Sequence, residues 1–305
     1  MKVVTAAVVV LALVPHARAA QVFRGGTDVV MLSVTVQDTQ GRLVPDLRLE
    51  DFQVFEDGVL QAVSNFSRDV EPIALSFLID TSASMDRKLG TAQEAAIGFL
   101  SRLTPQDLAM VIDFDAQARI KQPFTNDRVA LEAAVRATAV GGPTALYNAL
   151  YTALNELRVT RSEAKPGDPF RRQAIVVLSD GEDTASLIDD VAVLDAVRRS
   201  EVTLYAIGLR DPRRRDEERG FERSESFLLR LAQQTGGRAY FIEQVEELRG
   251  VYALIADELT SQYTIGYVSK NAVQDGGWRA VQVMTAVPNT QARTRAGYFA
   301  PRARR

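Results

Sequence analysis

The central part of the chain alternates short apolar runs with helix-like stretches. Runs of strand length occupy residues 73–79, 108–114, 174–179, 202–208 and 238–242. Helix-like stretches, in which apolar residues recur at three-to-four spacing, occupy 86–103, 127–138, 145–158, 188–199, 224–235 and 245–260. Nearly continuous apolar strands that alternate with helices indicate a mostly parallel sheet covered on both faces, a doubly wound α/β fold. Residues 118–124, after a short connection, are predicted to form an antiparallel edge strand.

The two flanks of this region have a β-like pattern. Residues 28–38 alternate apolar and polar positions, and Asp57-Gly58 separates two strand-like pieces, which is a strong hairpin signal. A second β-like segment covers 261–300. Each flank alone offers a hairpin or two, which would be marginally stable. We therefore predict that the flanks combine into one small β-sandwich into which the α/β unit is inserted. Two independent small sheets are the alternative.

The first twenty residues predict a secretory signal peptide. Lys2 precedes an apolar run, and Ala17-Arg18-Ala19 fits a small-residue cleavage pattern. The run is too short for a spanning helix, and no later segment approaches the roughly 18 apolar residues that one needs. We expect a secreted or periplasmic protein with no stable membrane insertion after cleavage. An uncleaved N-terminal membrane anchor is the alternative.

These patterns predict the organisation of the whole chain. The expected parts are a signal peptide (1–20), an N-terminal β part (21–71), the α/β domain (72–258), a C-terminal β part (259–301) and a basic tail (302–305). We call the two β parts together the β module. The net charge of −3 argues against a nucleic-acid partner, which would require a basic face.

The composition restricts the chemistry further. The chain has no cysteine, and its single histidine, His16, lies inside the predicted signal peptide. A mature chain without either residue excludes Ser-His-Asp and Cys-His nucleophile systems, HExxH proteases and the usual zinc sites. Any metal must therefore be held by oxygen ligands.

Oxygen-bearing side chains lie at the carboxyl ends of predicted strands or at the start of a predicted helix, on one edge of the sheet. They are Asp80, Ser82, Ser84, Thr144 and Asp180. Alternate positions in an extended loop point the same way, so the first three can converge on one point. Carboxylate and hydroxyl oxygens suit a hard cation, Mg²⁺, Mn²⁺ or Ca²⁺. Taken alone, Asp80-Thr81-Ser82-Ala83-Ser84 is also compatible with a cap or turn between a strand and a helix.

The combination resembles a known family. Asp80-Thr81-Ser82-Ala83-Ser84, Thr144 in GGPTAL and Asp180 in SDGED are similar, in order and spacing, to the metal-ion-dependent adhesion site of von Willebrand factor type A domains. The strand–helix alternation over about 73–258 agrees with that fold. The resemblance implies that these five residues bind the metal. A looser resemblance to bacterial secreted proteins with this domain rests on EDFQVFEDG and RAGYF.

The leading functional hypothesis is a non-enzymatic, metal-dependent protein-binding module. Two carboxylates and three neutral hydroxyls leave a divalent ion with a coordination position that an acidic side chain of a protein partner can fill. The alternative is a metal-dependent hydrolase or phosphatase with Glu182 or Asp183 as base. Against it, Ser82 stands where a DxDxT phosphatase has its second Asp, and the chain has no phosphate-binding loop and no histidine base. A degenerate domain that works without metal is a third possibility.

Overall fold

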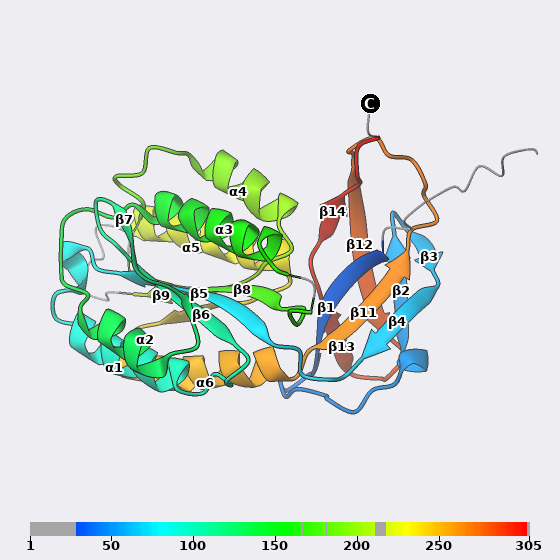
Figure 1. Cartoon of the computed structure of the whole chain (residues 1–305), viewed down its shortest axis with the longest axis horizontal. Helices are drawn as coiled ribbons and strands as arrows, with labels where there is room; N and C mark the ends of the chain where they lie inside the picture. The colour runs from blue at the N-terminus through cyan, green and yellow to red at the C-terminus, as the bar shows by residue number, and fades with distance from the viewer. Residues whose placement is uncertain (1–28, 166, 181, 211–217, 304–305) are drawn as a thin grey trace, which may run out of the picture.

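The computed structural model describes residues 29–165, 167–180, 182–210 and 218–303. The predicted signal peptide, His16 and the last two residues of the predicted basic tail lie outside the described residues. The chain forms an α/β unit, at the left of Figure 1, and a β module, at the right. Among the described residues, no helix combines the length and hydropathy needed to cross a membrane.

A six-stranded sheet forms the centre of the α/β unit. Its strands are β5 (Ile73–Asp80), β6 (Leu108–Phe114), β7 (Ala118–Thr125), β8 (Arg172–Ser179), β9 (Thr203–Leu209) and β10 (Ala239–Ile242). Their order is β10-β9-β8-β5-β6-β7, and all neighbours are parallel except β7, which runs antiparallel at the edge. The structure confirms the mostly parallel sheet and the antiparallel edge strand.

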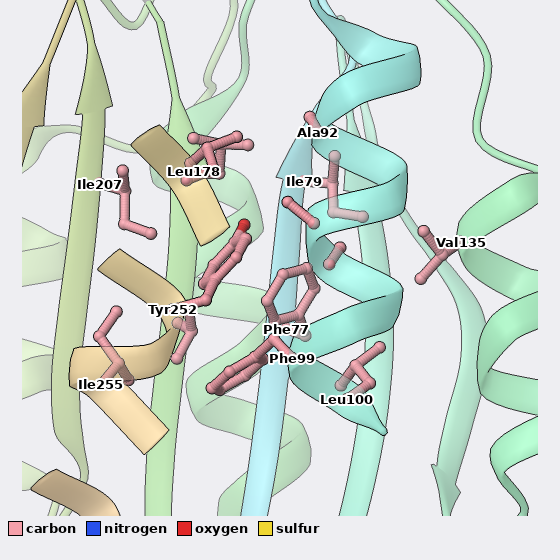
Figure 2. Close-up of a cluster of buried hydrophobic side chains, with 14 of the residues drawn as sticks. Phe77, Ile79, Ala92, Phe99, Leu100, Val135, Leu178, Ile207, Tyr252 and Ile255 are labelled. Carbon is pink, nitrogen blue, oxygen red and sulfur yellow. The ribbon is translucent and has the colours of Figure 1, made fainter. Parts of the chain in front are cut away.

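Helices cover both faces of this sheet, as the sequence predicts. The helices on one face are α3 (Leu146–Ser162), α4 (Asp190–Arg199) and α5 (Glu218–Thr235), and those on the other are α1 (Leu89–Leu100), α2 (Arg128–Arg136) and α6 (Leu248–Thr260). The second face packs around Phe77, Phe99 and Tyr252, with ring centroids 5.2–5.6 Å apart (Figure 2). Helix α5 begins at Glu218 rather than near 224, because the Glu and Arg residues before the apolar stripe also favour helix.

The two flanks are interleaved in one β-sandwich, which confirms the predicted insertion. Its strands are β1 (Val29–Asp38), β2 (Phe52–Glu56), β3 (Val59–Gln61), β4 (Val63–Ser67), β11 (Tyr263–Val268), β12 (Trp278–Thr285), β13 (Thr290–Arg293) and β14 (Gly297–Phe299). The sheets have the orders β13-β1-β11-β4 and β14-β12-β2-β3, so each contains strands from both flanks. Asp57 and Gly58, with φ of 48° and 80°, make the predicted hairpin turn between β2 and β3.

Short 3₁₀ helices complete the described secondary structure: η1 (Leu49–Asp51), η2 (Ala83–Met85) and η4 (Val245–Glu247). The chain leaves the β module and enters the central sheet at Ile73, the first residue of β5. The carboxyl ends of the parallel strands therefore lie at the end of the sheet that is remote from the β module (Figure 1). We call this end the site edge.

Hydrogen bonds join the α/β unit to the β module. The carboxylate of Glu258, on α6, is buried and accepts from the Tyr205 hydroxyl of β9 at 2.8 Å. The same oxygen accepts from Thr35 of β1 and pairs with Arg293 of β13. Arg172, at the start of β8, donates to the carbonyl of Glu71, in the connection from β4 to β5, at 3.2 Å, and to that of Leu259, in α6, at 2.7 Å. The junction is thus a polar network shared by elements of both parts.

Candidate metal centre

The first loop of the site edge begins where β5 ends. Asp80 is its last residue, and its side chain is buried. The Ser82 backbone N–H donates to Asp80 Oδ1 at 2.8 Å, which is the local turn that an Asp favours. The chain then turns into η2, and this turn leaves the Ser82 and Ser84 hydroxyl oxygens 3.0 Å apart. The sequence Asp-x-Ser-x-Ser therefore makes both a turn and a cluster of oxygens.

The second loop follows β8, the neighbour of β5 in the sheet. The Ser84 hydroxyl donates to Asp180 Oδ1 at 2.6 Å, and the Ser179 hydroxyl donates to Asp80 Oδ2 at 2.6 Å. Both bonds cross between residues about a hundred positions apart in the chain. They bring the two carboxylates and the hydroxyls of Ser82 and Ser84 into one connected cluster.

The third loop packs against the other two through its backbone. Gly141 N–H donates to the Thr81 carbonyl at 2.7 Å, and Ala83 N–H donates to the Gly142 carbonyl at 3.0 Å. Thr144 is buried, and its carbonyl accepts from the Thr184 N–H at 2.8 Å. The structure therefore brings all five predicted residues to the site edge, with Thr144 held between the loops that carry the carboxylates.

Lys88 is a member of the site that the sequence reasoning missed. Its Nζ lies 2.6 Å from Asp180 Oδ2, and the side chains of Lys88 and Asp180 are 19% and 0% exposed. The only sequence signal is its position four residues after Ser84, at the start of α1. A lysine in such a place is ordinarily solvated, so the pattern alone does not single it out.

Asp183 has a structural role in the same loops. Its Oδ2 accepts from the Tyr147 backbone N–H at 2.9 Å and from the Ser186 hydroxyl at 2.6 Å. The first bond satisfies a free N–H in the first turn of α3, the helix that Thr144 precedes. Glu182 lies 4.0 Å from Arg223. The carboxylate of Asp183 is thus engaged in holding α3, which leaves Glu182 as the remaining candidate base of the hydrolase alternative.

The electrostatics of the cluster favour a cation. Burial raises the pKa of Asp80 to about 6, the negative charge of Asp180 adds to the increase, and hydrogen bonds from Ser179 and Ser82 oppose it. Two carboxylates in one buried cluster are therefore costly to ionise without a positive charge beside them. Lys88 supplies such a charge at Asp180, with its Nζ 2.6 Å from Oδ2.

The donor set fits a hard divalent ion. Within the described residues, no three Asp, Glu or His side chains lie close enough to hold a metal by themselves. The two carboxylates would therefore need the neighbouring hydroxyl oxygens to complete a site. Carboxylate and hydroxyl oxygens suit Mg²⁺, Mn²⁺ or Ca²⁺.

Comparisons with known proteins agree with this fold. Residues 75–253 match the von Willebrand factor type A domain. A UPF0353 protein of Mycolicibacterium paratuberculosis is 27% identical over 216 residues, which cover 66% of this chain and 63% of the relative. Inter-alpha-trypsin inhibitor heavy chain 4 of Mus musculus is 28% identical over 214 residues, 65% of this chain and 21% of the relative. The chain thus spans less than two thirds of the length of either relative.

A solved structure has a similar fold over most of this chain. A von Willebrand factor type A protein from Catenulispora acidiphila superposes with a TM-score of 0.50 over 92% of this chain and 76% of that one. The two sequences are 14% identical, so the similarity concerns the fold alone.

Proposed function

The chain belongs to the von Willebrand factor type A domain family, and from this premise we propose that it is a divalent-metal-dependent protein-binding module acting outside the cytoplasm. Domains of this family are often metal-dependent protein-interaction modules. The observation that carries the proposal is the hydrogen bond from Ser84 to Asp180 at 2.6 Å, which joins the two carboxylate-bearing loops into one oxygen cluster.

Five residues would hold the ion: Asp80, Ser82, Ser84, Thr144 and Asp180. Bound there, Mg²⁺ (or Mn²⁺ or Ca²⁺) supplies a positive centre to which an acidic side chain of a protein partner can bind. The residues that hold the ion leave it able to bind a further acidic group. Two carboxylates leave the ion short of negative ligands, and the hydroxyls add oxygen without charge. The site edge is remote from the β module, so that module does not cover it.

The residues around the proposed metal site favour a role in protein binding over a role in catalysis. Asp183 is engaged in capping α3, and Ser82 occupies the position of the second carboxylate of a DxDxT phosphatase. The predicted signal peptide and the absence of cysteine and of a mature-chain histidine support a secreted or periplasmic module whose chemistry depends on oxygen ligands.

Thermal unfolding tests the metal site. We expect saturating Mg²⁺ or Mn²⁺, compared with chelator, to stabilise the mature wild-type protein, by about 2.7 kcal/mol at 100 times the dissociation constant. Asp80→Asn should abolish this shift. Asp107→Asn is the matched control, because Asp107 is also a buried Asp but binds the Ile73 N–H at the opposite end of the sheet. No shift in the wild type, or a full shift in Asp80→Asn, would disprove the site.

A metal-dependent pull-down from the envelope fraction of the source cell tests the binding function. A captured protein should be released by chelator, should not bind Asp80→Asn, and should lose binding when one of its acidic residues is changed to an amide. Turnover of a phosphoester panel that Asp80→Asn abolishes would instead favour the hydrolase.

A further inference from the structure

One cationic side chain is built into the oxygen cluster. Lys88 places its ammonium 2.6 Å from Asp180 Oδ2, while Asp180 Oδ1 accepts from Ser84. Asp180 thus has a partner on each carboxylate oxygen. The pair is largely shielded from water, because the Asp180 side chain has no exposed surface and that of Lys88 is 19% exposed. Such a pair differs from a surface salt bridge, since removing one member leaves an uncompensated charge in a buried place.

Backbone hydrogen bonds fix the position of the Lys88 Cα, from which the side chain extends. Lys88 N–H donates to the Met85 carbonyl at 2.8 Å, and Ala92 N–H donates to the Lys88 carbonyl at 3.0 Å. The residue therefore connects η2, which carries Ser84, to the first turn of α1. The contact between Lys88 and Asp180 is a consequence of how the Asp-x-Ser-x-Ser loop continues into its helix.

We propose that Lys88 is an internal counter-cation of Asp180, which keeps the metal-free site stable and lowers its affinity for a divalent ion. The inference rests on the proposed metal site. A divalent ion entering the cluster meets one of two costs. Either the ammonium leaves Asp180 Oδ2, and the buried ion pair is lost, or it stays, and two positive charges lie close together in a poorly solvated place. In both cases Lys88 competes with the metal.

This competition determines the metal concentration at which the site becomes occupied. A site with two buried carboxylates and no internal cation would be unstable when empty and would retain its ion tightly. With Lys88 present, we expect the protein to fold without metal and the occupancy of the site to follow the surrounding metal concentration. Binding of an acidic partner would then depend on that concentration.

The test compares Lys88→Met with the wild type and with Lys165→Met. Methionine keeps much of the side-chain length and removes the charge. Lys165 is exposed in the connection between α3 and β8, so its replacement makes the same charge change away from the cluster. Isothermal titration calorimetry gives the dissociation constant for Mn²⁺ at neutral pH and fixed ionic strength. Thermal unfolding in chelator and in saturating Mn²⁺ gives the stability of the empty and loaded forms.

We expect Lys88→Met to bind Mn²⁺ about tenfold more tightly, and Lys165→Met to stay within twofold of the wild type. Lys88→Met should unfold several degrees lower in chelator and recover in saturating Mn²⁺. A merely structural role would lower stability in both conditions and leave the dissociation constant unchanged, which would overturn the inference. Weaker Mn²⁺ binding by Lys88→Met would overturn it as well.

The outcomes also separate this inference from the proposed function. If wild type, Lys165→Met and Lys88→Met bind Mn²⁺ equally, the metal site stands and only the role of Lys88 is wrong. If none binds, both proposals fail. Should Lys88→Met fold only when Mn²⁺ is added, the counter-cation role is supported. If it fails to fold in either condition, Lys88→Gln is titrated instead, and an affinity equal to the wild type would overturn the proposal.

Discussion

At the scale of single residues, Asp80 couples the stability of the chain to pH. Its carboxylate is buried at the end of β5, and its pKa is raised from 3.8 to about 6, first by burial and then by the charge of Asp180. The folded state therefore holds a proton on Asp80 more tightly than the unfolded state does. This contribution to stability is complete below pH about 4 and is lost as the pH rises through about 6.

We predict the following pH dependence in chelator. The unfolding free energy of the wild type, relative to Asp80→Asn, should fall by up to about 3 kcal/mol between pH 4 and 7, since one pKa unit corresponds to about 1.4 kcal/mol. Saturating metal should reduce this fall, because a cation stabilises the ionised carboxylate. Chemical denaturation of both proteins across this range measures the difference. A constant difference would show that Asp80 has an ordinary pKa in the folded chain.

At the scale of elements, the site depends on close packing between three loops. A Cβ on Gly141 would lie 1.8 Å from Asp115 Oδ2, and Arg119 holds that carboxylate at 2.7 Å, so it cannot easily move away. A Cβ on Gly142 would meet only Ala116, at 3.8 Å. There is therefore space for a side chain at Gly142 but not at Gly141, although the two adjacent glycines look equivalent in the sequence.

Gly141→Ala should displace the loop that carries Thr144, and Gly142→Ala should not. We expect the first variant to lose about 1–3 kcal/mol of stability through overpacking and to bind Mn²⁺ several-fold more weakly. The second should stay close to the wild type on both measures. Denaturation and calorimetric titration of the pair provide the comparison. Equal behaviour of the two variants would mean that the Asp115 contact does not position the loop.

The sequence predicted the loops of this site better than the contacts between them. Strand periodicity and the Asp-x-Ser-x-Ser spacing located Asp80, Ser82 and Ser84 because these are local patterns. The bonds of Lys88 to Asp180 and of Asp183 to α3 join different loops by flexible side chains. Their reach depends on the folded positions of both ends, which spacing does not encode. The early start of α5 has another cause, since residues 218–223 contain a single apolar residue, Phe221, and therefore no apolar periodicity to detect.

At the scale of the whole molecule, the junction joins the two parts through buried charge. Glu258 receives hydrogen bonds from Tyr205 and Thr35 and pairs with Arg293, so strands of both parts converge on one carboxylate. Replacing one member of such a buried pair is more damaging than replacing both, because the remaining charge is left without a counter-charge.

Arg293→Met should therefore destabilise the chain by about 3–5 kcal/mol. The double variant Arg293→Met/Glu258→Gln should be more stable than this single variant, because no buried charge remains unpaired. Chemical denaturation of the two single variants and the double variant gives the coupling energy. The Mn²⁺ affinity of all three should match the wild type, since the junction lies at the end of the sheet opposite the site edge. Additive losses would indicate that the pair is not coupled.

The interleaving of the flanks also has a consequence for the order of folding. Val34 of β1 pairs with Tyr263 of β11, more than 200 residues later in the chain. Closing so long a loop in an unfolded chain is entropically costly and slow. The α/β unit removes this obstacle when it folds first, because Arg172 then binds the carbonyls of both Glu71 and Leu259. We therefore expect the inserted unit to serve as the template on which the surrounding sandwich closes, since β1 can pair with β11 only after the residues of β11 have been synthesised.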